Sequence, residues 1–245
     1  MSLKSIKVPT IDFVNKRHWA MIFSAILLVA SIISLSVQGL KLGIDFTGGT
    51  LIEVGYQQTA NLEEIRGKLN EANYRGTNVQ YFGTDTEVLI QLEPQQVSSA
   101  KLSSSIIRML GEGIDVRRVE FVGPKVGEEL TNDGGLAMLY ALIGILIYVA
   151  FRFEYRFALG SIAALIHDVI IVLGIFSALQ IEFDLTVLAA ILAVIGYSLN
   201  DTIVVFDRIR ENFLSTRQVE PKPIINDALN QTLSRTIMTS LTTLL

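Results

Sequence analysis

The sequence has no cysteine and only two histidines among its 245 residues. Without cysteine the chain has neither a disulfide framework nor a thiolate metal site. The two histidines, His18 and His167, are far apart and lack the spacing of metal ligands, so we expect no metal site. The net charge of −4 is modest, which argues against nucleic acid as a partner. No nucleophile and base signature of a hydrolase is present, and we expect no enzymatic activity.

Charge is also scarce. Charged residues make up 18% of the chain, against about 25% in ordinary soluble domains. Half of the residues are hydrophobic, and the mean hydropathy is +0.47. This composition predicts a polytopic α-helical membrane protein with a single insert that is more polar than the rest of the chain.

Apolar runs of about 20 residues can cross the ~30 Å hydrocarbon core of a bilayer. Four such spans and the start of a fifth are expected, at residues 19–38, 134–151, 157–181, 185–206 and 232–245. Because the fifth run is short, we expect the chain to be a portion of a longer protein. Basic residues gather in segments 1–18, 152–156 and 207–231. The positive-inside rule places these segments in the cytosol, which gives a multi-pass protein with a cytosolic N-terminus.

The polar insert, residues 39–130, follows the first span and is therefore expected outside the cytosol. Its apolar positions alternate as in strands or repeat at helical spacing. The expected elements are a strand at 51–56, a helix at 62–72, strands at 79–81 and 88–92, a helix at 102–109 and a strand at 116–121. This βαββαβ order is typical of a ferredoxin-like α+β domain.

An aspartate, Asp201, lies inside the fourth apolar run, and four apolar residues from Ile203 to Phe206 follow it. A carboxylate in a membrane span costs roughly 2.5–3.5 kcal/mol on insertion scales and usually faces a bundle interior or a water path. The alternative is a helix that ends near Asn200, but the apolar residues after Asp201 argue against it.

Arg235 opens the fifth run within a polar stripe that also contains Thr232, Thr236, Thr239 and Thr242. Counting residues from the cytosolic side suggests that Asp201 and Arg235 lie at comparable depth and meet. An acid beside an arginine in a dry bundle can change its protonation, as a proton relay requires. The alternative for Arg235 is that its side chain extends to lipid headgroups.

Other polar residues in the runs have simpler interpretations. Asp168 and His167 are better explained as a hydrogen-bonded pair in helix packing, with a weaker place for Asp168 in a proton path. Tyr197 and Asn200, with Ser198, extend a wet face beside Asp201. The small residues Ala189, Ala190, Ala193 and Gly196 indicate close helix contact. Segment 47–50, Thr-Gly-Gly-Thr, resembles a phosphate loop only superficially and is better explained as a tight turn into a strand.

Four motifs in the same order resemble the SecF family of protein-export subunits. They are LGIDFTGGT (42–50), VEFVGPKVGEEL (119–130), ALIHDVIIVLGIF (164–176) and GYSLNDTIVVFDRIRENF (196–213). Within the first two, the family motif falls on Asp45, Gly48, Gly49, Gly123 and Pro124.

The resemblance implies a half-unit of the resistance-nodulation-division superfamily with six spans in the bacterial cytoplasmic (inner) membrane. It implies SecD, SecYEG and YajC as partners, preproteins as substrates, and protons as the coupling ion with no other cofactor. It also implies a proton path through Asp201 in the fourth span and Arg235 in the fifth. Two alternatives stay open, an exporter of small molecules or lipids and a non-energised scaffold of the translocase.

Overall fold

The computed structural model describes residues 10–74, 76–94, 99–111, 113–215 and 220–244. Residues 1–9 of the predicted cytosolic leader and residues 216–219 of the predicted cytosolic segment lie outside the described residues. The chain divides into two compact units. The sheet unit comprises residues 41–139 and 182–188, and the helical unit comprises the remainder.

The sheet unit is built around four antiparallel strands in the spatial order β3-β4-β2-β5. Its elements in chain order are β2 (Gly49–Gly55), α3 (Leu62–Glu71), β3 (Asn78–Phe82), β4 (Thr84–Leu92), α4 (Ser99–Leu110) and β5 (Asp115–Val122). The βαββαβ order expected from the sequence is therefore the order observed.

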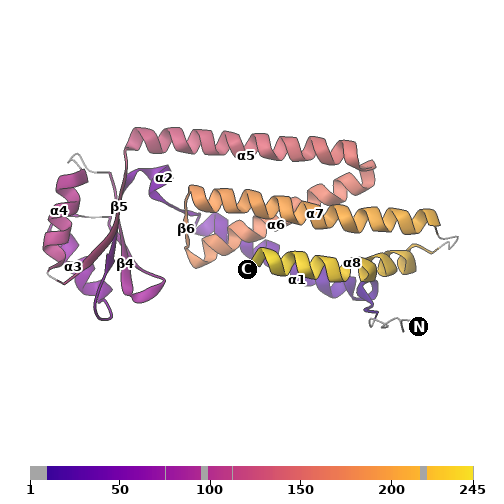
Figure 1. Cartoon of the computed structure of the whole chain (residues 1–245), viewed down its shortest axis with the longest axis horizontal. Helices are drawn as coiled ribbons and strands as arrows, with labels where there is room; N and C mark the ends of the chain where they lie inside the picture. The colour runs from indigo at the N-terminus through magenta and orange to yellow at the C-terminus, as the bar shows by residue number, and fades with distance from the viewer. Residues whose placement is uncertain (1–9, 75, 95–98, 112, 216–219, 245) are drawn as a thin grey trace, which may run out of the picture. The chain divides into compact units, whose positions relative to one another are not determined.

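The two helices of the sheet unit, α3 and α4, lie on one face of the sheet (Figure 1). The core between them is fully buried and includes Ile52, Leu69, Val88, Ile90 and Ile106. Alternate residues of β2 and β4 point to this core because successive strand residues face opposite sides.

Three short elements were absent from the sequence prediction: β1 (Lys41–Leu42), α2 (Ile44–Thr47) and β6 (Glu182–Phe183). Strands β1 and β6 form a separate parallel pair. Ile44 of α2 packs with Leu51 and Leu89 on the second face of the main sheet. Elements of two to four residues are too short to show a periodic apolar pattern, which is why the sequence did not indicate them.

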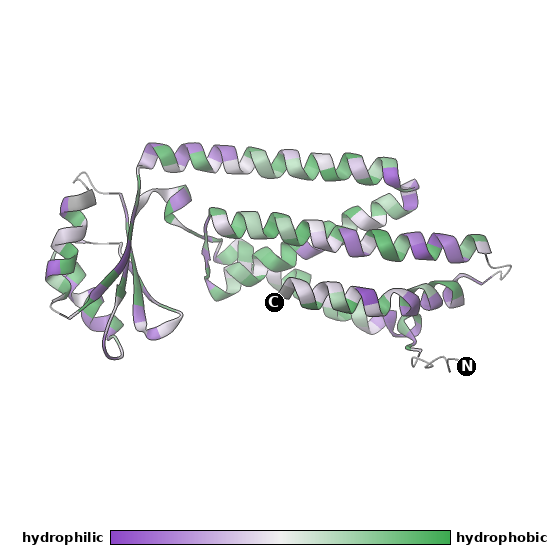
Figure 2. Cartoon of the chain, in the orientation of Figure 1, coloured by the Kyte–Doolittle hydropathy of each residue, from purple (hydrophilic) through white to green (hydrophobic). Residues whose placement is uncertain are grey.

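The long helices are α1 (Phe13–Val37), α5 (Pro124–Arg152), α6 (Tyr155–Leu179), α7 (Leu185–Ser215) and α8 (Pro221–Leu244). In the described ranges, the first four of these are long and apolar enough to cross a membrane. Figure 2 shows hydrophobic residues along most of these helices, with polar residues gathered toward the C-terminal part of α7. Helix α8 does not reach the same apolarity over its described length, so its role as a fifth span stays a prediction.

The long helices extend beyond the apolar runs that predicted them, and α1 begins at Phe13 rather than 19. Helix α5 begins at Pro124 rather than near residue 134, α7 continues to Ser215, and α8 begins at Pro221 rather than 232. Pro124 and Pro221 each occupy the first helical position, where the missing N–H costs nothing and the fixed φ favours a helix. The apolar pattern reports only the part of a helix that lies in lipid, and so it underestimated the helix lengths.

Helices α1 and α6 pack closely through small residues. Ser31 and Gly174 are both buried, and a Cβ built on Gly174 would lie 2.2 Å from the Ser31 Cβ. One turn further along, the hydroxyls of Ser34 and Ser177 are 2.9 Å apart. The small-residue stripe predicted on α7 is exposed, and a Cβ on its Gly196 would meet no described residue within 4 Å, so its close helix contact stays a prediction.

Candidate functional site

A chain of hydrogen bonds joins three helices of the helical unit. Asp168 of α6 accepts a hydrogen bond of 2.5 Å at Oδ2 from the Ser198 hydroxyl of α7. Its other oxygen, Oδ1, lies 2.9 Å from Nδ1 of His167. The second ring nitrogen of His167, Nε2, lies 2.5 Å from the Ser24 hydroxyl of α1. The four side chains therefore form one polar path from α1 through α6 to α7.

This network can hold an additional proton without losing a hydrogen bond. With Asp168 ionised and His167 neutral, Nδ1–H donates to the carboxylate and Nε2 accepts from Ser24. A proton added at Nε2 makes that nitrogen a donor, and the Ser24 hydroxyl then becomes the acceptor. The pair interpreted from the sequence as helix packing is thus both a packing contact and a group that can bind a proton.

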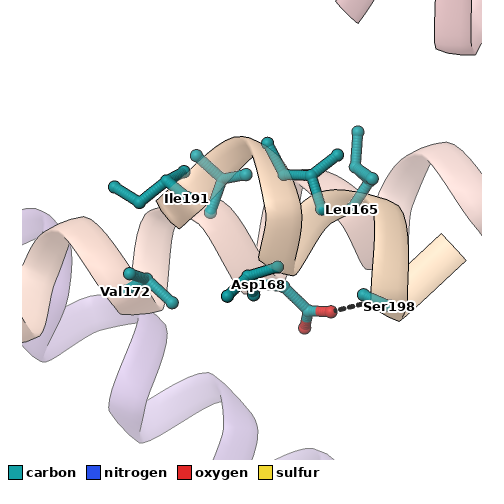
Figure 3. A pocket seen from close by; sticks show the side chains of 8 residues that line it. Leu165, Asp168, Val172, Ile191 and Ser198 are labelled. Carbon is teal, nitrogen blue, oxygen red and sulfur yellow. Dashed lines mark hydrogen bonds between the residues drawn. The ribbon is translucent and has the colours of Figure 1, made fainter. Parts of the chain in front are cut away.

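A small hollow lies beside Asp168, between α6 and α7. Figure 3 shows apolar side chains such as Leu165, Val172 and Ile191 around it, with the Asp168 carboxylate at one end bonded to Ser198. The Asp168 side chain keeps 40% of its surface exposed in the isolated chain. A carboxylate is costly to leave in hydrocarbon, so this surface favours a neighbouring protein or water over lipid acyl chains.

Asp201 lies on α7, ten residues after Ile191 and five before Phe206, and it is half-buried. Its Oδ1 atom is buried and has no hydrogen-bond partner among the residues that the structure describes. A buried polar atom that lacks a partner costs roughly 1–3 kcal/mol. Such an atom requires an explanation, and a proton-binding role or a partner supplied from outside this chain would each provide one.

Arg235 is exposed and, among the described residues, no salt bridge joins it to Asp201. A hydrogen bond of 3.3 Å joins Asn212 of α7 and Gln231 of α8. This bond serves as a common reference level for positions along the two helices. At about 1.5 Å per residue, Arg235 lies roughly 6 Å from that level and Asp201 roughly 16 Å. Counted in this way, the two residues differ by about 10 Å in depth, and their meeting stays a prediction.

The other predicted path residues differ in their exposure. Tyr197 and Asn200 are exposed, and Tyr197 keeps 51% of its surface. Thr239 is half-buried, and its carbonyl accepts hydrogen bonds from the next threonines of α8. Tyr197 and Asn200 of the predicted wet face are therefore on the surface of the chain, and their place in a proton path stays a prediction.

The residues of the family motif lie in the sheet unit. The Asp45 carboxylate accepts a hydrogen bond of 3.1 Å from the backbone N–H of Leu185, the first residue of α7. Gly48 and Gly49 have positive φ angles of 71° and 135°, which glycine adopts without strain. The carbonyl of Gly123 accepts the N–H of Gly127 at the start of α5, where Pro124 is the first helical residue.

Several interacting residues were not singled out from the sequence. Asn226 and Asn230 of α8 bind the backbone before α1: the side chain of Asn230 accepts from the Ile11 N–H at 2.8 Å and donates to the Ile11 carbonyl at 2.9 Å. Asn226 accepts from the Phe13 N–H at 2.8 Å. Their spacing of four residues places both amides on one helix face, which is the signal that the sequence contained.

An ionic cluster in the sheet unit was also missed. Glu182 and Lys41 are paired across β1 and β6, and both are half-buried. Burial raises the pKa of Glu182; Lys41 lowers it, and Asp184 and Asp45 add to the rise. Burial also lowers the pKa of Lys41, against the opposing effect of Glu182. Residues 140 positions apart in the sequence form this cluster, so no local pattern could indicate it.

No group of three or more histidine, cysteine, aspartate or glutamate side chains is placed to hold a metal ion in the described part of the chain. The candidate site is therefore the polar network of α1, α6 and α7 together with the carboxylate of Asp201. Its available chemistry is the binding and release of protons.

Comparisons with known proteins show the family of the chain. The family described as "Protein export membrane protein SecD/SecF, C-terminal" matches residues 103–245, and the "SecD/SecF GG Motif" matches residues 33–60. The chain is similar to "Protein translocase subunit SecF" of Vibrio alginolyticus, at 54% identity over 96% of this chain and 76% of the relative. The protein of the same description from Pseudomonas aeruginosa is 49% identical over 98% of this chain and 79% of the relative.

A solved structure resembles the whole chain. The crystal structure of SecDF from Thermus thermophilus, described as a translocon-associated membrane protein, superposes with a TM-score of 0.87 at 35% identity. The superposition covers 99% of this chain and 34% of the SecDF chain. The chain thus spans about a third of the length of that structure.

Proposed function

Because the chain belongs to the SecF family of protein translocase subunits, we propose that it is an accessory subunit of the Sec machinery that couples the proton gradient to protein export. The observation that carries the coupling is the buried, unpartnered Oδ1 of Asp201 within the apolar helix α7. Protonation would remove the charge of this carboxylate and change the packing that α7 prefers. A proton shifts such an equilibrium only by its differential affinity for the two states.

The proposed partners follow from the family. SecD would complete the membrane bundle, since the similar SecDF chain is about three times as long as this one. SecYEG and YajC would be further partners, preproteins the substrates, and the inner-membrane lipid the surroundings. In this proposal the sheet unit is a ferredoxin-like domain on the outer side, the N-terminus is cytosolic, and six spans complete the half-unit.

The two ends of the proposed proton path are Asp201 and Arg235. They are apart in the conformation described above, so the proposal requires a second conformation in which α8 or water brings them together. Asp168 with His167 would be a weaker second proton site, and Tyr197, Asn200 and Thr239 would line the path.

The test is Asp201→Asn in the intact protein assembled with its partners, with Asp207→Asn as the matched control. Asp207 lies on the same helix but is bonded to Arg152 at the helical unit's surface. We expect Asp201→Asn to keep assembly and to abolish the gradient-dependent part of preprotein export, whereas Asp207→Asn keeps it. Normal gradient-dependent export by Asp201→Asn would refute the coupling.

A non-energised scaffold is the second candidate function. The observation that favours it is that Arg235 is exposed and forms no salt bridge with another described residue in this conformation. Arg235→Ala separates the two. A scaffold would export normally with this substitution, whereas the coupled subunit would lose its response to the proton gradient.

A further inference from the structure

The segment that leaves α1, residues 41–49, binds the loop between α6 and α7. Lys41 and Leu42 of β1 pair in parallel with Glu182 and Phe183 of β6. The N–H of Gly43 then donates to the Phe183 carbonyl at 2.9 Å. A Cβ on Gly43 would lie 3.0 Å from Oε1 of Glu182, so glycine permits this close approach.

Two carboxylates cap the start of α7. Asp184 is the local cap and accepts from the Val187 N–H at 2.7 Å. Asp45 comes from 140 residues earlier in the chain and accepts from the Leu185 N–H at 3.1 Å. The first four N–H groups of a helix have no partner within the helix, and a carboxylate there also interacts favourably with the helix dipole. Asp45 therefore contributes a cap that only the folded segment can place.

The same segment is fastened to the sheet and to α5. A Cβ on Gly49 would lie 2.3 Å from the Leu92 carbonyl oxygen of β4, and a Cβ on Gly127 of α5 would lie 2.9 Å from the Gly48 nitrogen. The Thr131 hydroxyl of α5 is 3.3 Å from the Phe46 carbonyl. The backbones are thus in direct contact, with no space for side chains between them.

The aromatic rings of this segment add a second connection. Phe46 of α2 stacks with Phe183 of β6, with ring centroids 5.9 Å apart. Phe183 is buried, so the contact lies inside the sheet unit rather than on its surface. The loop between α6 and α7 is consequently held by backbone pairing, by the Asp45 carboxylate and by ring stacking.

We propose that residues 41–49 form a coupling joint that holds the start of α7 within the sheet unit, with Asp45 as its positioning residue. Helix α7 is continuous from Leu185 to Ser215, and Asp201 lies about 24 Å along it from Leu185. A change in α7 that follows protonation of Asp201 would reach the sheet unit through this joint. The proposal rests on the proposed proton-coupled function and adds the element that passes the change outward.

The test measures proton conduction and gradient-dependent export separately in vesicles that contain the intact protein and its partners. We expect Asp45→Ala to keep proton conduction and to lower gradient-dependent export at least fivefold. Asp45→Asn keeps an acceptor oxygen and should retain most of the export. Asp85→Ala is the matched control, because Asp85 also accepts a side-chain hydrogen bond in the sheet unit, from Thr59, but lies at the opposite end of β4 from Leu92, which the joint approaches.

A rescue experiment separates fastening from a general loss of folding. Lys41 and Glu182 are direct partners on neighbouring strands, which are about 4.8 Å apart, within the range that a disulfide spans. The chain has no other cysteine, so Lys41→Cys with Glu182→Cys can be oxidised selectively. In the Asp45→Ala background we expect the oxidised pair to restore export and the reduced pair not to.

The outcomes distinguish the joint from the function on which it rests. Normal export by Asp45→Ala, or equal loss of conduction and export that the disulfide does not restore, would overturn the joint. Absence of gradient-dependent export in the unsubstituted protein would overturn the proposed function instead. If Asp45→Ala conducts protons without export, and the disulfide restores export, the result supports both the joint and the proposed function.

Discussion

Gly174 of α6 faces Ser31 of α1 so closely that a Cβ on Gly174 would lie 2.2 Å from both the Cβ and the Oγ of Ser31. The Ser31 Cα would be only 2.6 Å away, so a shift of the serine side chain alone cannot relieve the contact. This approach brings the backbones together and allows the neighbouring hydroxyls of Ser34 and Ser177 to meet at 2.9 Å. Close packing through small residues is a common means of helix association in membranes.

Gly174→Ala should therefore destabilise the helical unit. Overpacking of this kind costs typically 1–3 kcal/mol, which should lower the melting temperature in detergent by several degrees. Gly144→Ala on α5 is the control, because a Cβ there meets nothing within 4 Å. Adding Ser31→Gly to Gly174→Ala should restore only part of the lost stability, because it removes the contacts with Cβ and Oγ but leaves the Cα of residue 31 at 2.6 Å from the added Cβ. Melting of Gly174→Ala at the temperature of the unsubstituted protein would contradict this account of the interface.

Ser198→Ala should weaken the contact between α6 and α7. The substitution removes the 2.5 Å hydrogen bond to Asp168 Oδ2, and hydrogen bonds to charged groups contribute about 1.5–3 kcal/mol. Resistance to unfolding by added denaturing detergent should fall accordingly. Thr202→Ala is the control, since that hydroxyl bonds only the Ser198 carbonyl of its own helix. Equal resistance in both variants would show that the network adds no stability.

Asn226→Ala should loosen the start of α1. The Phe13 N–H loses its acceptor at 2.8 Å, while Asn230 still holds Ile11. Loss of about 1 kcal/mol of hydrogen bonding corresponds to roughly fivefold faster amide exchange. Hydrogen exchange followed by mass spectrometry on peptides that contain residue 13 measures this. Asn212→Ala, which removes a contact between α7 and α8, should leave that exchange unchanged.

Glu182→Gln should stabilise the sheet unit at neutral pH but not in acid. Burial raises the pKa of Glu182 above its ordinary value of 4.5, so the folded state binds its proton more tightly than the unfolded state does. Stability contributed by the protonated acid is present below about pH 4.5 and is lost as the pH rises through the raised folded pKa. Glutamine does not ionise and avoids that loss, while Lys41 keeps its 2.6 Å hydrogen bond to Gln80.

The measurement is thermal unfolding of the intact protein at several pH values between 4 and 8, with Glu63→Gln as the control on the exposed face of α3. The melting temperatures of Glu182→Gln and the unsubstituted protein should converge in acid and differ at higher pH, where the variant should have the higher melting temperature. A constant difference across this range, or a lower melting temperature for the variant at pH 8, would refute the assignment.

The long elements were predictable because each carries a local signal. The apolar runs indicated four long helices, and alternation around Leu51, Val88 and Val119 indicated three strands of the sheet. The helix ends at Pro124 and Pro221 were missed, because the apolar pattern stops where the lipid does and the helices continue. The short pieces β1, α2 and β6 carry no period at all.

The polar residues were predictable as individuals but not as partners. Asp201, Asp168 and Arg235 stand out because charge is rare in apolar runs. Their partners depend on helix rotation and depth: Asp168 binds Ser198 and His167, whereas no salt bridge joins Asp201 and Arg235 among the described residues. A residue count along one helix does not determine its position against the next.

The sequence by itself determined the class of protein, the membrane helices, the βαββαβ order and the resemblance to SecF, because apolar period and motif order are properties of the linear chain. Only the tertiary structure decided that Asp45 caps α7, that Ser24 reaches His167 and that Asn226 holds α1. These contacts join residues more than 100 positions apart, and their geometry depends on how whole helices and strands pack.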